Sequence, residues 1–175
     1  LDLRTGRFTS PHVESITERI SIDGAPLDEE AFVRAFNDVA PYTHLVDAAS
    51  EHPLSFFETV VGMAYAAFAD APVDVAVVEV GMGGSWDATN VADATVAVVL
   101  PVALDHAVYL GETVEAIAAE KAGILKPGCT AVLASQEPTA ATVLTARAQE
   151  VGATVAREGV EFGVLRRAAA VGGQV

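Results

Sequence analysis

The sequence lacks the cysteines that build a disulfide framework and the long apolar runs that build a membrane span. It contains a single cysteine, Cys129, which excludes an internal disulfide and a cysteine-ligated metal cluster. No apolar run approaches the roughly 20 residues that a membrane-crossing helix needs. No cleavable signal segment is recognisable either. These absences predict a soluble, cytoplasmic protein with no membrane partner.

Basic residues are also scarce. Lys and Arg total 10 against 24 Asp and Glu, which gives a net charge of −14. Such a chain repels the phosphates of a nucleic acid, so no nucleic-acid partner is expected. Any phosphate that it binds has to be held by backbone amides or by metal ions. The only two lysines are Lys121 and Lys126.

The glycine motifs that bind nucleotides are missing. No Gly-x-x-x-x-Gly-Lys-[Ser/Thr] occurs anywhere in the sequence. Gly81, Gly83 and Gly84 do not complete a dinucleotide fingerprint, because Trp86 stands where that motif requires Gly or Ala.

Helical and strand patterns alternate along the chain. Strands are predicted at residues 73–80, 95–102, 130–135 and 153–157, and helices at 28–40, 55–71, 112–122 and 138–151. Residues 16–22 alternate like an edge strand, and Pro41 is expected to end the first helix and to open a loop over 41–53. This order predicts an α/β fold with a mostly parallel sheet and helices on both faces. We expect one α/β body over residues 1–158, with 159–175 beginning a separate antiparallel segment.

The stretch 73–90 is the centre of the pattern, because a valine-rich strand runs into a glycine-rich loop. Residues 75–80 read as a strand covered on both faces, yet Glu79 stands near its end. The carboxyl ends of parallel strands are where open α/β sheets bind ligands. Glu79 is therefore a candidate ligand residue, although a salt bridge to an arginine or a helix cap would also explain it.

Other polar residues follow neighbouring predicted elements. Ser10, Glu79, His106 and Lys121 come from four loops or helix ends that a parallel sheet can gather at one edge. A hydroxyl, a carboxylate and an imidazole suit a divalent cation, with Mn²⁺ accepting the imidazole more readily than Mg²⁺. A lone histidine such as His106 is more commonly a hydrogen-bonding loop residue, and that alternative stays open.

Taken in order, the motifs resemble the folylpolyglutamate synthase and dihydrofolate synthase family, which is similar in fold to the muramyl ligases. The resemblance covers essentially the whole chain and rests on these segments: Ser-Pro-His at 10–12, Glu-Arg-Ile at 18–20, Phe-Phe-Glu at 56–58, Glu-Val-Gly-Met-Gly-Gly at 79–84, Asp-Ala-Thr-Asn at 87–90, Leu-Asp-His at 104–106, Leu-Gly at 110–111 and Glu-Lys-Ala-Gly-Ile at 120–124.

The resemblance implies ATP-dependent amide formation between a pterin-bearing carboxylate, dihydropteroate or folate, and L-glutamate. An acyl phosphate is the implied intermediate. Two Mg²⁺ sites are implied, with Ser10 and Glu79 at the first, beside the triphosphate of ATP. His106 and a carbamylated Lys121 are implied at the second site, and these two are the implied catalytic residues.

The pterin pocket is implied at Ser55, Phe57, Asp87 and Ala88. Two departures from the family stand out: Ser85 replaces the arginine of a Gly-Gly-Arg segment, and the phosphate loop that precedes Ser-Pro-His is absent. We therefore expect a central-domain piece of such a ligase, truncated at both ends and inactive alone. A muramyl-type amino-acid ligase and a non-catalytic pterin-binding or partner-binding remnant are the alternatives.

Overall fold

The computed structural model describes residues 2–105, 107–165, 169–170 and 173–174. The chain forms two compact units, which we describe separately. Unit 1 comprises Leu1–Met82 and Asp87–Val91, and unit 2 comprises Gly83–Trp86 and Ala92–Val175. The glycine-rich loop therefore contributes residues to both units.

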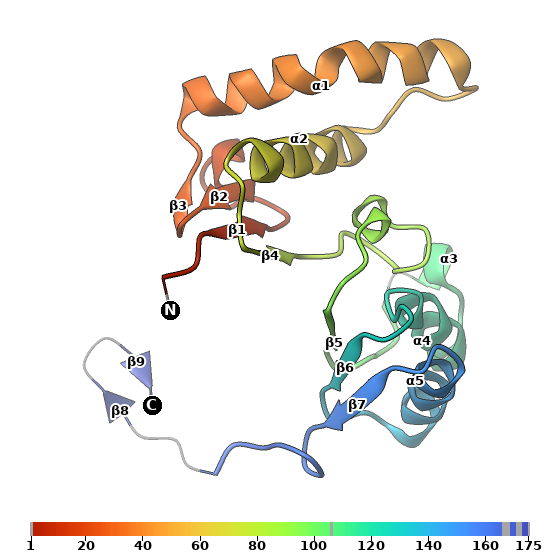
Figure 1. Ribbon diagram of the computed structural model, residues 1–175. Coiled ribbons are helices and arrows are strands. Elements are labelled where there is room, and N and C mark those ends of the chain that lie inside the picture. The colour runs from red at the N-terminus through yellow and green to blue at the C-terminus, as the bar shows by residue number, and fades with distance from the viewer. Residues whose placement is uncertain (1, 106, 166–168, 171–172, 175) are drawn as a thin grey trace. The chain divides into compact units, whose positions relative to one another are not determined.

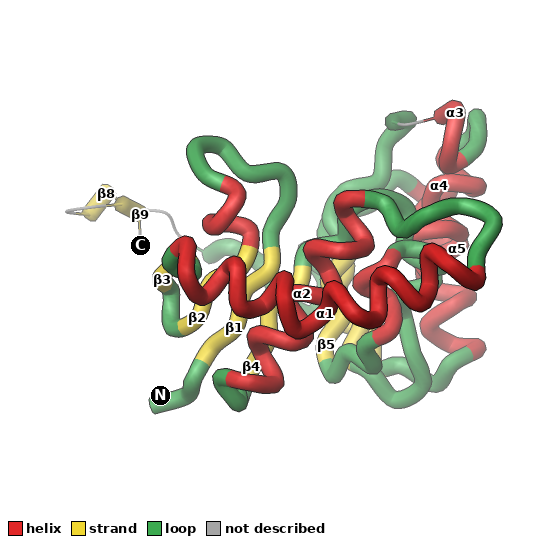
Figure 2. Tube along the Cα trace, turned by 90° about the horizontal axis from the view of Figure 1, so that it is seen from above, coloured by secondary structure: helices red, strands yellow, loops and turns green. Residues whose placement is uncertain are grey.

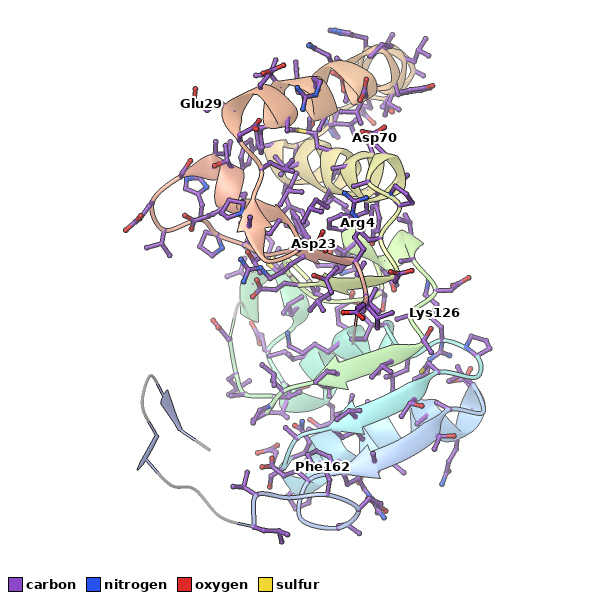
Figure 3. The ribbon with its side chains drawn as sticks, turned by 60° about the vertical axis from the view of Figure 1, so that its left-hand side comes forward. Arg4, Asp23, Glu29, Asp70, Lys126 and Phe162 are labelled. Atoms are coloured by element: carbon purple, nitrogen blue, oxygen red, sulfur yellow. The ribbon has the colours of Figure 1, made fainter. Side chains whose placement is uncertain are left out.

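Unit 1 is built on a mixed sheet in the order β3-β2-β1-β4 (Figure 1). Its strands are β1 (Thr5–Phe8), β2 (Ile20–Ile22), β3 (Ala25–Pro26) and β4 (Val75–Val78). β1 pairs antiparallel with β2 and parallel with β4, with Phe8 opposite Val78. At the other end of β1, Arg4 and Asp23 form an ion pair of 3.6 Å (Figure 3).

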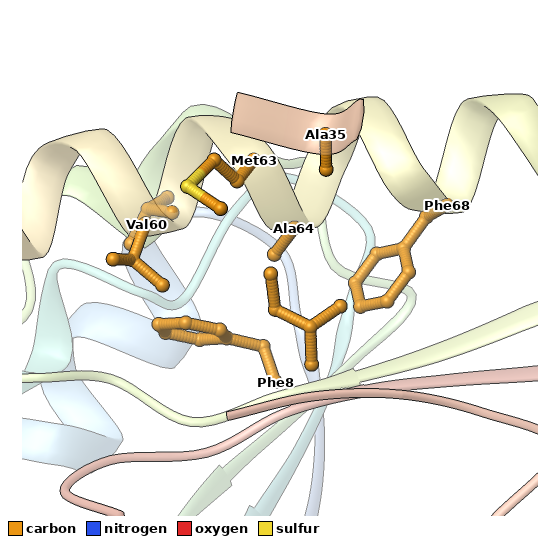
Figure 4. Packing of buried hydrophobic residues seen from close by; sticks show 8 residues of the cluster. Phe8, Ala35, Val60, Met63, Ala64 and Phe68 are labelled. Atoms are coloured by element: carbon orange, nitrogen blue, oxygen red, sulfur yellow. The ribbon is translucent and has the colours of Figure 1, made fainter. Parts of the chain in front are cut away.

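Two helices lie on one side of this sheet: α2 (Phe56–Asp70) packs on β1, and α1 (Glu29–Ala49) packs against α2 (Figures 1 and 2). Gly6 and Phe8 of β1 are buried beneath them, whereas Thr5 and Arg7 are exposed. Figure 4 shows how Phe8 and Phe68 pack with the buried side of α2. The apolar cluster of unit 1 comprises Phe8, Ile20, Ala35, Val60, Val61, Met63, Ala64 and Phe68.

Two predictions for unit 1 were wrong. α1 continues through Pro41 to Ala49, so the predicted loop over 41–53 is mostly helix. A proline costs one backbone hydrogen bond, but its fixed φ is helical, so the chain can keep its direction. The predicted strand over 16–22 begins as the 3₁₀ helix η1 (Ile16–Arg19), because Ser15 and Glu18 form a capping box.

Unit 2 contains an all-parallel sheet in the order β5-β6-β7. Its strands are β5 (Val96–Val99), β6 (Thr130–Leu133) and β7 (Thr154–Arg157). The helices are α3 (Ala107–Leu110), α4 (Val114–Ala122) and α5 (Pro138–Glu150). α4 and α5 pack together, and the buried side chains of this unit include Ala97, Leu133, Ile117 and Leu144.

The predicted elements of unit 2 are confirmed within a few residues. α4 starts later than expected, because Thr113 caps it by accepting a hydrogen bond from the Ala116 amide at 3.2 Å. Gly152 follows α5 with a positive φ of 66°, as its predicted role at the helix end requires. The short helix α3 was not predicted.

One face of β4 lies outside the apolar cluster of unit 1. Val77 is 62 % exposed and Val75 is 42 % exposed. Val78 instead packs against the apolar cluster. In unit 2, Val96 and Val98 of β5 are also about half exposed, whereas Ala97 and Val99 between them are buried. Each sheet thus presents a valine-bearing face opposite its covered face.

The α/β class and the predominance of parallel pairing are confirmed. β8 (Ala169–Ala170) and β9 (Gly173–Gln174) pair antiparallel, while the proposed domain boundary near residue 158 stays a prediction. Within the described residues, no helix combines the length and the apolar character needed to cross a membrane.

Candidate active site

Ser10 and Glu79 lie side by side at the carboxyl ends of β1 and β4. These strands are parallel neighbours, so the residues that follow them emerge at the same edge of the sheet. The Ser10 amide donates to Glu79 Oε2 at 2.9 Å, and the Glu79 amide donates to the Phe8 carbonyl at 3.0 Å. The structure therefore brings these two residues together, while their role as ligands of one metal stays a prediction.

The loop that carries Ser10 is closed by a carboxylate. Glu18 accepts hydrogen bonds from three consecutive amides, those of Val13, Glu14 at 3.2 Å and Ser15 at 3.1 Å. These bonds favour the ionised carboxylate, and the one from Val13 contributes most to lowering the pKa of Glu18. The sequence signal was a Ser-x-x-Glu capping box at 15–18, which our reading of this stretch as a strand missed.

Ser55 and Phe57 stand at the start of α2, as predicted. The Ser55 hydroxyl accepts from the Glu58 amide at 3.2 Å, and Glu58 accepts from the Ser55 amide at 2.7 Å. This reciprocal capping box, with the Ser55 side chain as its largest contributor, lowers the pKa of Glu58. It also fixes the first turn of α2, which carries Phe57.

The Phe57 ring packs directly on the glycine-rich loop. A Cβ atom at Gly81 would lie 2.3 Å from Phe57 Cζ, so only glycine allows this approach. Phe57 also contacts Phe8, with ring centroids 5.8 Å apart. The Phe57 ring thus contacts both the Gly81 backbone and Phe8, and an aromatic ring of this kind can contact another flat ring.

Asp87 braces the unit 1 part of the glycine-rich loop. It is buried at 6 % exposure and accepts from the Met82 amide at 2.9 Å. Its other oxygen accepts from the Thr89 amide at 2.9 Å and from the Thr89 hydroxyl at 2.5 Å. Ala88 follows at the start of η2 (Ala88–Val91) and packs against the apolar cluster.

Tyr65 supports the same turn and was missed by sequence reasoning. Its hydroxyl donates to the Thr89 carbonyl at 2.7 Å. Burial is the main cause of the raised pKa of Tyr65, with the charge of Asp87 second. Nothing in the sequence distinguished Tyr65 from the apolar residues of α2 around it.

Lys121 lies in unit 2, in the last turn of α4, where the remainder of the glycine-rich loop docks. A Cβ at Gly84 would lie 2.5 Å from the Glu120 carbonyl oxygen and 3.0 Å from Lys121 Cα. The Glu120 carbonyl accepts the Ser85 amide at 3.1 Å and the Ser85 hydroxyl at 3.2 Å. Ser85, which replaces the family's arginine, therefore contacts the helix end beside Lys121.

Glu120 is a second anchor that we had not assigned. Its carboxylate accepts from the Trp86 amide at 3.3 Å, in addition to the bonds made by its carbonyl. Gly123 completes the fit, since a Cβ there would lie 2.1 Å from Ser85 Oγ. The Glu-Lys-Ala-Gly segment is thus a docking surface for the loop as well as the carrier of Lys121.

His106 lies outside the described residues, so its predicted place at a second metal site stays a prediction. Among the residues that the structure describes, no group of three or more His, Cys, Asp or Glu side chains is arranged to hold a metal ion. Ser10, Glu79, Ser55, Phe57, Asp87 and Ala88 all belong to unit 1, and Lys121 belongs to unit 2.

The Ser10 and Glu79 pair nevertheless fits Mg²⁺ chemically. One Glu79 oxygen is engaged by the Ser10 amide, while the second oxygen and the Ser10 hydroxyl remain as hard oxygen donors. Mg²⁺ is typically held by one or two protein oxygens, with water and substrate phosphates completing its shell. The pair therefore suits a metal that arrives with a nucleotide.

No family model matches the chain. Among curated proteins, it is 50% identical to the dihydrofolate synthase/folylpolyglutamate synthase of Mycobacterium tuberculosis, over 100% of this chain and 39% of that protein. It is 39% identical to the folylpolyglutamate synthase of Lacticaseibacillus casei, over 93% of this chain and 38% of that protein. The chain thus spans about two fifths of the length of these relatives.

Solved structures give the same result. Folylpolyglutamate synthase of Mycobacterium tuberculosis, complexed with ADP and AMPPCP, superimposes with a TM-score of 0.93 at 52% identity, over 99% of this chain and 40% of that one. A folylpolyglutamate synthase complex with AMPPCP and folate gives a TM-score of 0.91 at 38% identity, over 99% and 42%. These likenesses define a Mur-ligase-like ligase fold. The chain belongs to the folylpolyglutamate synthase/dihydrofolate synthase family.

Proposed function

We propose that this chain is the central part of a cytoplasmic, ATP-dependent ligase that joins L-glutamate to dihydropteroate or folate. The observation that carries the proposal is the match to folate ligases over the whole chain, in which the Ser10 and Glu79 pair falls within matched sequence. One relative of known structure, from Escherichia coli, is described in complex with DHPP and ADP, which supports a pterin substrate here.

In this proposal, unit 1 contributes the residues that bind ATP and the pterin. Ser10 and Glu79 would hold a Mg²⁺ ion beside the triphosphate, and the ion would neutralise charge that develops on the transferred phosphoryl group. Phe57 and the Gly81 backbone would hold the pterin ring flat. Asp87 has one carboxylate lone pair beyond its three observed bonds, which can accept a hydrogen bond from the pterin.

Unit 2 would supply the second Mg²⁺ site, through His106 and a carbamylated Lys121. Carbamylation requires a neutral amine, which a lysine can provide and an arginine effectively cannot. The carbamate would replace a cation by an anion that faces the metal. Gly84 and Ser85 pack against the backbone of Glu120 and Lys121, so the loop would fix the helix turn from which this side chain extends.

Turnover of dihydropteroate and of folate, each with ATP and L-glutamate, tests the proposed activity. A full-length protein that contains this chain should form the glutamyl amide and release ADP and phosphate. The 175 residues alone should do neither, because they lack the phosphate loop motif. Ligation above background by the 175 residues would falsify the second statement, and a full-length protein inactive with both pterins would overturn the first.

Replacing Lys121 tests the second metal site. Lys121→Arg and Lys121→Ala should each lower kcat about 100-fold, the upper range for residues that support a metal. Added short carboxylic acids should partly restore the alanine variant, because they can replace the carbamate oxygens. Lys126→Arg is the matched control, since Lys126 is the only other lysine and forms an ion pair with Asp93 at 3.4 Å. Normal turnover of Lys121→Arg would exclude the carbamate.

A further inference from the structure

We propose that Arg19 is a positioning residue, which holds the loop of residues 9–15 in place and ties it to the start of α2. This inference rests on the proposed function, since the loop carries Ser10 and the start of α2 carries Ser55 and Phe57. Arg19 itself is not proposed to contact ATP or the pterin.

Arg19 contacts the residues on both sides of the Ser10-Pro11 pair. Its carbonyl accepts the Thr9 amide at 3.0 Å. Its guanidinium Nε donates to His12 Nδ1 at 2.9 Å. The main chain of Arg19 thus fixes the entry to the short segment in which Ser10 meets Glu79, and its side chain fixes the exit, so loss of the guanidinium releases the His12 side of the loop.

The contact with His12 also selects the form of the imidazole. A guanidinium has donors only, so Nδ1 has to accept and the ring proton lies on Nε2. His12 is exposed, and its Nε2–H is available as a donor two residues from Ser10. Arg19 therefore sets both the orientation and the tautomer of the imidazole.

A third contact reaches the pterin side. Arg19 Cζ lies 5.2 Å from the centroid of the Phe56 ring, a cation–π distance. Phe56 is the first residue of α2, between Ser55 and Phe57. The same guanidinium therefore connects the proposed metal loop with the helix end that carries two proposed pterin contacts.

The burial of Arg19 favours a specific role over simple space filling. The residue is only 8 % exposed, and the two side-chain contacts just described are with an imidazole nitrogen and an aromatic face, neither of which is an anion. Burying a cation without a countercharge is costly, and an apolar side chain would fill the space without that cost. A lysine would not substitute, because its ammonium lacks the planar face and the fixed Nε donor.

Kinetics of the full-length ligase test the inference. Arg19→Lys and Arg19→Gln should lower kcat/KM about 10- to 100-fold, as expected when a reacting geometry shifts by up to about 1 Å. The Mg²⁺ concentration for half-maximal rate should rise, and so should KM for the pterin. Arg7→Lys is the matched control, because Arg7 lies on β1 and donates to the Ser21 hydroxyl at 3.2 Å. It should leave all three parameters within twofold of wild type.

Two further measurements separate positioning from general stability. In ¹⁵N spectra of the full-length protein, His12 should show the Nε2–H tautomer in wild type and lose it in Arg19→Gln. A double-mutant cycle of Arg19→Gln with His12→Ala should be non-additive. The kcat/KM of the double variant should be no lower than that of the less active single variant.

The outcomes distinguish this inference from the proposed function. Fully additive effects, an unchanged tautomer, or wild-type kinetics and Mg²⁺ response in both Arg19 variants would overturn the positioning role and leave the ligase proposal intact. A wild-type full-length protein without ligase activity would overturn the proposed function, and the spectra would still decide whether Arg19 sets the state of His12.

Discussion

The two parts of the glycine-rich loop are held by different means. In unit 1, Gly81 and Met82 are held by side chains, namely the Phe57 ring and the Asp87 carboxylate. In unit 2, Gly84 and Ser85 are held mainly by the main chain of α4 at Glu120. The first part depends on which side chains surround it, and the second depends on having no side chain of its own at Gly84.

Removing the Asp87 carboxylate should have the largest effect on stability. Asp87→Ala leaves the amides of Met82 and Thr89 and the Thr89 hydroxyl without their buried acceptor. We expect a loss of about 3 kcal/mol, since each unsatisfied buried group costs about 1–3 kcal/mol. Urea unfolding followed by circular dichroism measures the loss. Asp93→Ala, whose side chain is 90% exposed, should cost less than about 1 kcal/mol.

Adding a methyl group at Gly84, in the unit 2 part of the glycine-rich loop, should have the next largest effect on stability. Gly84→Ala places a Cβ 2.5 Å from the Glu120 carbonyl oxygen, so the loop or the helix has to shift. Such overpacking costs about 1–3 kcal/mol. The opposite sign is expected for Gly62→Ala, inside α2 with no neighbour within 4 Å, which should gain about 0.5–1 kcal/mol. Equal effects of both substitutions on the urea midpoint would contradict the steric explanation.

Removing the Ser55 hydroxyl should have a smaller effect on stability. Ser55→Ala removes the acceptor for the Glu58 amide at the start of α2. The expected loss is about 1 kcal/mol, typical of a helix N-cap. Thermal unfolding measures it, with Ser50→Ala at the end of α1 as the control that should leave the midpoint unchanged. A loss at Ser50 as large as that at Ser55 would mean that the capping box is not the cause.

Mild acid should produce the smallest effect, confined to segments held by carboxylates. The pKa of Glu18 in the folded chain lies below the ordinary value of a glutamate, chiefly because its carboxylate accepts the Val13 amide. The stabilisation by Glu18 is therefore complete above about pH 4.5 and is lost as the pH falls through the lower folded value. The protection factors of the Val13 to Ser15 amides against hydrogen exchange should fall in that range. Glu18→Gln should remove this pH dependence, whereas the Ser85 amide, bound to a carbonyl, should show none from this cause.

Much of the fold was predictable, because it depends on local patterns. The strands β5 to β7 and the helices α2 and α5 follow from apolar spacing and from caps such as Ser55 and Gly152. The errors arose where local rules conflict. Pro41 usually ends a helix, and residues 16–22 alternate like a strand although Ser15 and Glu18 cap a helical turn.

The site was predictable only in part. Strand order places Ser10 beside Glu79, and parallel pairing was the basis of that prediction. Arg19, Tyr65 and Glu120 were not found as supports, because their importance depends on contacts with residues distant in sequence or on backbone carbonyls.

The attachment of Ser85 to a main-chain carbonyl also determines how the sequence can vary. Every residue type carries a carbonyl, so position 120 can change and still accept the Ser85 amide. Positions 84 and 123 lack that freedom, because any side chain there would collide with Glu120 or Ser85. A saturation-mutagenesis profile of folding should therefore show broad tolerance at 120 beside narrow tolerance at 84 and 123. In this part of the protein, substitution should therefore be limited most at the smallest residues.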